Sequence, residues 1–249
     1  MSKLVAGTVL VVLVLAVTLA GAGCSGDDDA TSTTTTTEPP PPEDFPEDPE
    51  ARETLDRFVQ AAGKRDTATM WSLLDSASQQ RYGPTEAEFA AGPGSDLSVV
   101  LGSFARKGGS YDHVLAKKVS DLWSVAAING FVTLEGKEEW GAYAAVVDHE
   151  DGEPKISLAG TVTFTPVTPE PELVSGPTPS VATEVSASEP VLDAVIWVDD
   201  TRIAAELAPD AILLTGEVTT PLEPGRHAVV TFADTQSGAG ANAYSFESK

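Results

Sequence analysis

The order of apolar and polar positions divides the chain into four stretches with different periodicities. Residues 4–23 form one apolar run without a charged residue, whereas residues 25–48 carry almost no apolar side chains. From residue 49 apolar positions recur at the three- and four-residue spacing of amphipathic helices. From about residue 110 they follow a period of two and favour β-branched and aromatic residues, which is typical of strands.

The helical stretch has a strong start signal. Asp48 and Pro49 are a favoured N-cap and first helical residue, and Gly63 is expected to end that helix. Asp66 can cap a second helix. The first helix has its apolar positions on one face: Leu55, Phe58, Val59 and Ala62. The second helix is expected at residues 66–74. Chain breaks are expected at residues 82–84 and 92–94, and further short helices at residues 85–90 and 97–104.

Strands follow these helices. They are expected at residues 113–120, 124–134, 140–147 and 155–158, with the last two paired as a hairpin across the polar turn 148–154. Helices followed by antiparallel strands predict an α+β domain over residues 49–159.

Residues 160–249 lose the helical periodicity. About seven short strands are expected, separated by turns that include residues 209–210, 224–225 and 238–240. Prolines such as Pro166 and Pro169 place the first of these segments at a sheet edge or in a loop. The spacing predicts an all-β sandwich, and Trp197 is a candidate residue for the core between its two sheets.

Composition narrows the function. The 249 residues include 15 Lys and Arg against 38 Asp and Glu, for a formal net charge of −23. That charge argues against a nucleic-acid partner, because phosphate binding needs a cationic surface. The single cysteine excludes an intrachain disulfide and a Cys-rich metal site.

The single cysteine, Cys24, directly follows the apolar run. Lys3, the run and its small-residue exit have the layout of a secretory signal. Leu19-Ala20-Gly21-Ala22-Gly23-Cys24 resembles the lipobox of bacterial lipoproteins, although Gly21 stands where that family usually has Leu. The resemblance implies a signal peptide over residues 1–23 and a diacylglyceryl (palmitate-type) membrane anchor on Cys24, facing outside the cytoplasm. The alternative is an uncleaved N-terminal membrane helix.

Residues 24–48 are expected to form an acidic, Thr- and Pro-rich disordered tether. No Lys or Arg lies between Lys3 and Arg52, and Phe45 is the one large apolar side chain of the segment. Like charges repel and prolines favour an extended backbone, so the segment should hold the folded part away from the membrane. The threonine run 33–37 could accept O-linked sugar.

The first folded region resembles the NTF2-like cone, in which N-terminal helices cover a curved antiparallel sheet. The residues that carry this resemblance are Phe58-Val59-Gln60-Ala61, Lys64-Arg65-Asp66 and Met70-Trp71-Ser72-Leu73-Leu74. Members of this fold can hold a ligand pocket. The candidate pocket residues are Tyr82, Tyr111, Asp112, His113 and Tyr143, for which core packing is the competing interpretation.

The second region resembles immunoglobulin-like bacterial surface domains. Leu222-Glu223-Pro224-Gly225-Arg226-His227 is similar to the turn that leads into their penultimate strand, and residues 242–246 would form the last strand. The resemblance implies a binding or structural module, because the fold carries no activity of its own.

No catalytic sequence motif stands out, so we expect no enzyme activity, no cofactor and no metal. The expected function is that of a lipid-anchored, extracytoplasmic envelope protein that acts as a non-enzymatic binding or scaffold module for a protein or cell-wall partner. One alternative is a small-ligand sensor or weak enzyme with a pocket in the NTF2-like region. Another is that the immunoglobulin-like region binds the partner and the first region is a spacer.

Overall fold

The computed structural model describes residues 44–106, 108–134, 137–150, 152–171, 173–209 and 212–249, which all belong to one compact unit, Pro40–Lys249. Residues 1–43 lie outside the described ranges. The signal peptide, the lipid attachment at Cys24 and most of the tether therefore stay predictions.

Helix α1 (Pro49–Lys64) begins where the sequence predicts. Asp48 Oδ1 accepts the backbone N–H groups of Glu50 at 3.1 Å and Ala51 at 3.0 Å, which satisfies donors of the first turn. The predicted end at Gly63 is wrong, because the helix continues to Lys64 and is capped by Arg65 at φ 56°. Gly63 serves packing instead: a Cβ there would come within 2.8 Å of the Ala105 Cβ.

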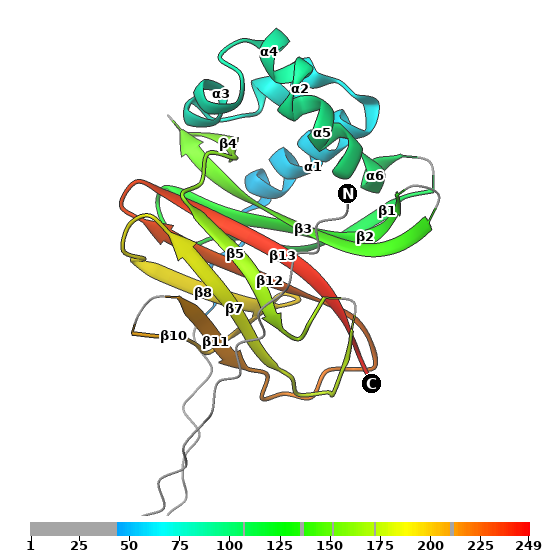
Figure 1. The fold of residues 1–249 in the computed structure, drawn as a ribbon, viewed down its shortest axis with the longest axis vertical. Helices are drawn as coiled ribbons and strands as arrows, with labels where there is room; N and C mark the ends of the chain where they lie inside the picture. Colours follow the sequence, from blue (N-terminus) through cyan, green and yellow to red (C-terminus); the bar gives the residue numbers. More distant parts are fainter. Residues whose placement is uncertain (1–43, 107, 135–136, 151, 172, 210–211) are drawn as a thin grey trace, which may run out of the picture. The chain divides into compact units, whose positions relative to one another are not determined.

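Short helices follow α1 (Figure 1). They are α2 (Thr67–Ser72), α3 (Ser76–Tyr82), α4 (Glu86–Ala91), α5 (Pro93–Val100) and α6 (Gly102–Ala105). Asp66 caps α2 as predicted. Two expectations were incomplete, because α3, which Asp75 caps, was not foreseen, and Pro93 opens α5 instead of only breaking the chain.

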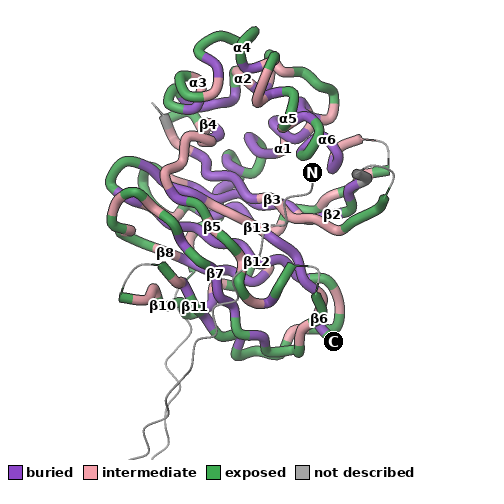
Figure 2. The backbone as a smooth tube through the Cα atoms, viewed as in Figure 1, coloured by how far each residue is buried: buried purple, intermediate pink, exposed green. Residues whose placement is uncertain are grey.

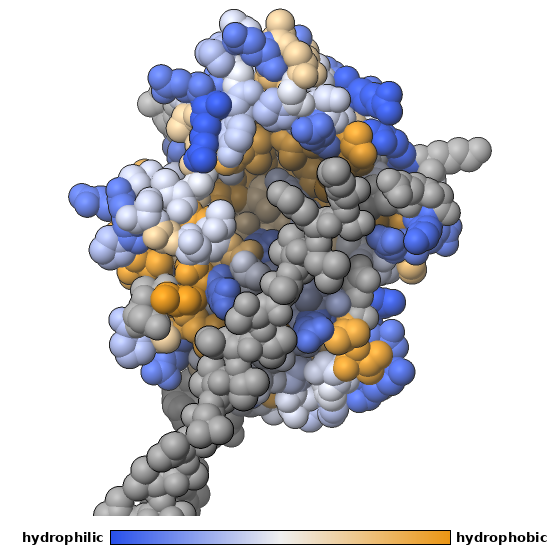
Figure 3. Space-filling view, in the orientation of Figure 1, coloured by the Kyte–Doolittle hydropathy of each residue, from blue (hydrophilic) through white to orange (hydrophobic). Residues whose placement is uncertain are grey.

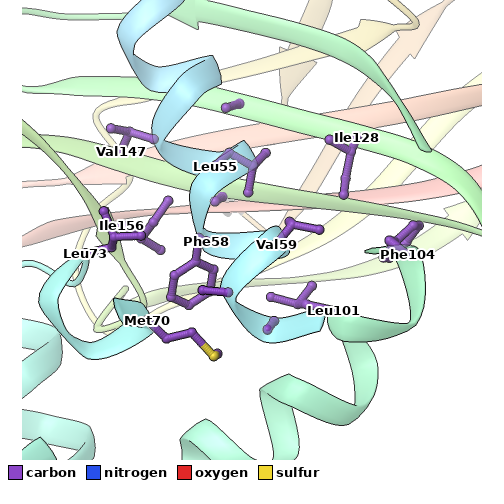
Figure 4. Close-up of a cluster of buried hydrophobic side chains, with 14 of the residues drawn as sticks. Leu55, Phe58, Val59, Met70, Leu73, Leu101, Phe104, Ile128, Val147 and Ile156 are labelled. Atoms are coloured by element: carbon purple, nitrogen blue, oxygen red, sulfur yellow. The ribbon is translucent and has the colours of Figure 1, made fainter. Parts of the chain in front are cut away.

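Four antiparallel strands form the helix-covered sheet. In spatial order they are β1 (Ser110–Lys118), β2 (Trp123–Leu134), β3 (Lys137–Glu150) and β4 (Glu153–Ser157). The predicted β3–β4 hairpin is confirmed. One face of this sheet packs against the helices, with Leu55, Phe58 and Met70 fully buried between them (Figure 4).

The remaining strands of the described residues form two sheets in the order of an immunoglobulin-like sandwich. The outer sheet runs β10 (Ala205–Leu207), β11 (Leu213–Glu217), β7 (Ser180–Ala187), β5 (Val162–Thr168). The middle sheet runs β6 (Val174–Ser175), β13 (Gly238–Ser248), β12 (Gly225–Thr235), β8 (Asp193–Val198), β9 (Thr201–Ile203). The chain leaves β5 at the edge of one sheet and enters β6 at the edge of the other, where β6 runs parallel to β13. This strand order establishes the predicted sandwich, with the proline-bearing β5 at an edge.

Two details of the sandwich differ from prediction. The expected turn at residues 238–240 lies at residues 236–237, so Gly238 already pairs with Thr235 in β12–β13. Trp197 is not between the two sheets of the sandwich. Ile196 and Val198 face the outer sheet, so the alternation of β8 turns Trp197 to the opposite side.

The middle sheet is buried on both faces. Trp197, Val230 and Phe232 pack against Val125 and Val146 of the helix-covered sheet in a cluster distinct from the sandwich core. Strand β12 accordingly has an almost continuous run of buried residues (Figure 2). The two predicted regions are thus joined by a shared apolar core.

Residues 44–48, which we call the strap, lie against both regions. The strap extends the edge of β1: Asp48 N–H donates to Ala116 O and Lys118 N–H donates to Pro46 O, both at 2.9 Å. Phe45 packs on Trp197 of β8 with ring centroids 6.0 Å apart. The predicted tether therefore ends in a docked segment.

The strap also neutralises a buried cation. The Lys117 side chain is only 8% exposed, and its Nζ lies 2.5 Å from Asp44 Oδ2 and 2.7 Å from Glu47 Oε1. Burial would lower the pKa of Lys117, but the two carboxylates outweigh it and raise the pKa. The strap is thus held by charge as well as by the Phe45 ring.

Candidate functional site

Four polar side chains meet between α1 and the edge strand β1, and we call them the α1–β1 cluster: Asp56, Gln60, Tyr111 and His113. The Tyr111 hydroxyl donates to Asp56 Oδ1 and accepts a hydrogen bond from Gln60 Nε2 at 2.8 Å. His113 Nε2 lies 3.8 Å from the same Asp56 oxygen. The Asp56 carboxylate therefore accepts a hydrogen bond from the Tyr111 hydroxyl and also lies close to the His113 ring.

Local backbone geometry brings these side chains together. Asp56 and Gln60 are four residues apart and share one face of α1. On β1 the strand register shifts between His113 and Leu115, so Val114 is an extra, bulged residue. In a regular strand Ala116 would lie on the opposite face from Tyr111 and His113. The bulge shifts the alternation by one residue, so all three face the helices.

The pKa values of Tyr111 and His113 are both shifted, which limits the acid–base chemistry of the cluster. Burial, and then the hydrogen bond to Asp56, raise the pKa of Tyr111 to about 12. Burial lowers the pKa of His113, an effect that Asp56 opposes and Arg52 reinforces. At neutral pH Tyr111 is therefore a protonated donor and a poor nucleophile or base, and the cluster is better suited to hydrogen bonding than to proton abstraction.

The predicted pocket residues lie in different places. Tyr143 faces the helices in the row that pairs it with Ile128 and His113, and burial raises its pKa to about 12. Asp112 is exposed on the other face of β1. Tyr82 ends α3, packs against the helical core and has the Arg81 guanidinium 5.4 Å from its ring centre.

Sequence reasoning missed Asp56 and Gln60. Polar residues on the outer side of an amphipathic helix are normally solvated, and only their four-residue spacing marked them as neighbours. Asp56 lies 55 positions before Tyr111 and Gln60 lies 51 positions before it, and no local pattern shows such a connection.

The space between the helices and the sheet is filled by apolar side chains. Leu55, Phe58, Val59 and Ile128 are all 0% exposed. Figure 4 shows several of them directed into one cluster from α1 and the sheet. Two pockets lie in the sandwich, lined by residues between 165 and 212.

A second polar group ties the start of α1 to the sheet. Asp48 Oδ2 accepts from Ser124 Oγ at 2.5 Å and lies 3.0 Å from His149 Nε2, and Ser124 Oγ lies 2.9 Å from that same Nε2. Burial alone would raise the pKa of Asp48, but the bonds from Ser124, the Ala51 amide and His149 lower it overall. A nucleophilic triad needs the carboxylate and the hydroxyl on different ring nitrogens, whereas both lie on Nε2 here, so this group lacks the triad geometry.

Figure 3 shows hydrophilic residues over much of the helical surface and apolar residues below α5. Across the described ranges, no three His, Cys, Asp or Glu side chains gather as metal ligands would. None of the described helices has the length and apolar character needed for a bilayer span.

No protein-family model and no curated protein matches the chain. Among solved structures, a titin tandem of immunoglobulin domains is 12% identical, with a TM-score of 0.28 over 51% of this chain and 87% of that one. Sidekick-1 immunoglobulin domains 1–5 are 15% identical, with a TM-score of 0.23 over 49% and 25%.

An endo-β-1,4-mannanase from Thermotoga petrophila is 15% identical, with a TM-score of 0.32 over 35% of this chain. The match spans a fifth of the length of that enzyme. Likenesses at these TM-scores transfer no activity, so the immunoglobulin-like arrangement rests on the strand order of the two sandwich sheets.

Proposed function

We propose that the protein is a lipid-anchored envelope protein on the extracytoplasmic face of the membrane, acting as a non-enzymatic binding or scaffold module. The anchor part is supported by the lipobox-like segment that ends at Cys24. The partner would be a protein or a cell-wall component, and the formal charge of −23 disfavours nucleic acid.

The observation that carries the non-enzymatic part is the filled space under the helices. An NTF2-like cone that works on a small molecule needs an enclosed cavity with convergent polar groups. Here Leu55 and Phe58 are fully buried in that space, and the α1–β1 cluster lies at its exposed rim, with His113 29% and Asp56 44% exposed. The NTF2-like assignment of residues 49–159 is supported by helices that precede an antiparallel sheet and cover one of its faces.

The anchor is tested with Cys24→Ser and with Ser25→Ala as the neighbouring control. Wild type and Ser25→Ala should fractionate with the membrane and carry an acylated residue 24 at the mature N-terminus, as read by mass spectrometry. Cys24→Ser should be released or keep its leader. An intact Met1 on mature wild-type protein would overturn the lipoprotein proposal.

Binding is tested in intact cells with photo-crosslinking residues placed in the full chain. One position is Asp112, exposed beside the α1–β1 cluster, and the other is Glu206, exposed on β10. A binding module should give an adduct of defined mass at one position, which also tells which region meets the partner. Only unadducted protein at both positions, under conditions that crosslink a known complex, counts against the proposal.

A small polar ligand at the α1–β1 cluster is the second candidate, favoured by the hydrogen bonds that join Asp56, Tyr111 and Gln60. A polar metabolite panel in a thermal-shift assay tests it. A ligand of this site should stabilise wild type and fail to stabilise Tyr111→Phe. Equal stabilisation of both proteins would exclude the cluster as the binding site.

A further inference from the structure

A pocket of about 620 Å³ opens at one end of the sandwich, a size within the range of small-ligand sites. Strands β5 and β7 form one wall, in which Thr165 pairs with Glu184. The segment that follows β7 adds Glu189 and Val191, and Ile212 completes the rim. Val185 N–H donates to Ile212 O at 2.6 Å, so the rim is tied to β7 by the backbone.

The polar lining of the pocket is acidic. Glu184 and Glu189 supply carboxylates and Thr165 and Ser186 supply hydroxyls, while Lys, Arg and His are absent from its described lining. Glu189 Oε2 is buried and has no hydrogen-bond partner among the described residues. A buried polar atom without a partner is costly, and a carboxylate oxygen is best satisfied by a cationic donor.

The apolar part of the lining selects among cations. Val191 and Ile212 line the same pocket, and Ile212 is 53% exposed, whereas the Val185 side chain is buried in the sandwich core. Such walls suit a methylene chain that carries a charged head. A bare divalent cation would need more oxygen ligands than two separate carboxylates offer.

We propose that this pocket binds an alkylammonium group, with Glu189 as the counter-ion and the Val191 and Ile212 side chains beside the methylene stem. The same chemistry occurs in a lysine side chain presented by a partner and in a free aliphatic diamine. The inference goes beyond the proposed function and does not depend on the lipid anchor.

The test is an NMR titration of the full-length protein in detergent micelles. The probes are Nα-acetyl-lysine methylamide, its uncharged norleucine analogue, 1,4-diaminobutane and calcium ions. The lysine probe should saturably shift the Ser186 and Val191 amide signals, and the norleucine probe should bind at least about tenfold more weakly. Tighter binding of the lysine probe points to a presented side chain, and tighter binding of the diamine to a free amine.

Glu189→Gln keeps the shape of the side chain and removes its charge, and Glu206→Gln on β10 is the matched control. The first should weaken the lysine probe by about tenfold or more, and the control should leave its affinity within about twofold. Equal affinity for the norleucine probe, unchanged affinity in Glu189→Gln, or calcium binding tighter than either amine would overturn the proposal. The comparison of charged and uncharged probes on wild type decides the matter even if Glu189→Gln does not fold.

Discussion

Removal of the Lys117 cation should lower the free energy of unfolding much less than removal of its two partners, the strap carboxylates of Asp44 and Glu47. The Lys117 side chain is 8% exposed, whereas Asp44 and Glu47 are 38% and 54% exposed. In Lys117→Met the two carboxylates are left where water can reach them, and the Met side chain fills the buried site. We expect this change to alter the free energy of unfolding by no more than about 1 kcal/mol.

Removal of the anions leaves a buried ammonium without a partner. Loss of one side of a buried pair typically costs about 3–5 kcal/mol. Because the strap can come away and let water reach Lys117, we expect about 2–3 kcal/mol for the double variant Asp44→Asn/Glu47→Gln. The informative quantity is the ratio of the losses in free energy of unfolding that the two variants cause.

Urea unfolding followed by tryptophan fluorescence measures both values. Arg52→Gln is the control, because Glu47 also meets Arg52 at 3.1 Å on the exposed surface, a pair expected to contribute under about 1 kcal/mol. The raised pKa of Lys117 adds a pH signature: the stabilisation is complete below its ordinary pKa and is lost as pH rises through the raised value. A Lys117→Met variant that costs as much as the double variant would refute the reasoning.

Three further predictions concern the core, the N-cap and the cluster. Phe58→Ala should cost about 3–5 kcal/mol in chemical denaturation, and Phe131→Ala, at a site 47% exposed, about 1 kcal/mol or less; equal costs would contradict the packed interior. Asp48 has a lowered pKa, so its stabilisation is present above its ordinary pKa and lost as pH falls through the lowered one; Asp48→Asn keeps a capping side chain and should flatten the acid limb of the stability profile. Tyr111→Phe should cost about 1 kcal/mol, which a double-mutant cycle with Asp56→Asn can assign to their hydrogen bond.

Helix α1 shows how far local pattern reaches. Its start followed from Asp48 and Pro49, because capping depends on neighbouring residues alone. Its end did not, because Gly63 is kept small by the approach of Ala105 on α6. Tertiary packing decided a position that local chemistry would have used as a stop signal.

Trp197 shows what an alternating pattern leaves open. Its alternation with Ile196 and Val198 placed it on the other face of the strand, but alternation alone does not say which face meets which layer. Both faces of the middle sheet are buried, so a large apolar side chain can face either neighbouring layer. The assumption that Trp197 faces the sandwich core was therefore wrong. The α1–β1 cluster has the same origin: residue type marked Tyr111, and only the bulge at Val114 and the path of α1 bring it to Asp56.

The strap unites parts of the chain that are synthesised at different times. Its pairing with β1 becomes possible once Lys118 has been made, but Trp197 lies 153 positions after Asp44. Contacts between such distant positions form late, since the entropy of closing the intervening loop must first be offset. Phe45 can therefore dock only after strand β8 is in place. Its docking on Trp197 then reports that the helix-covered sheet and the sandwich have come into contact.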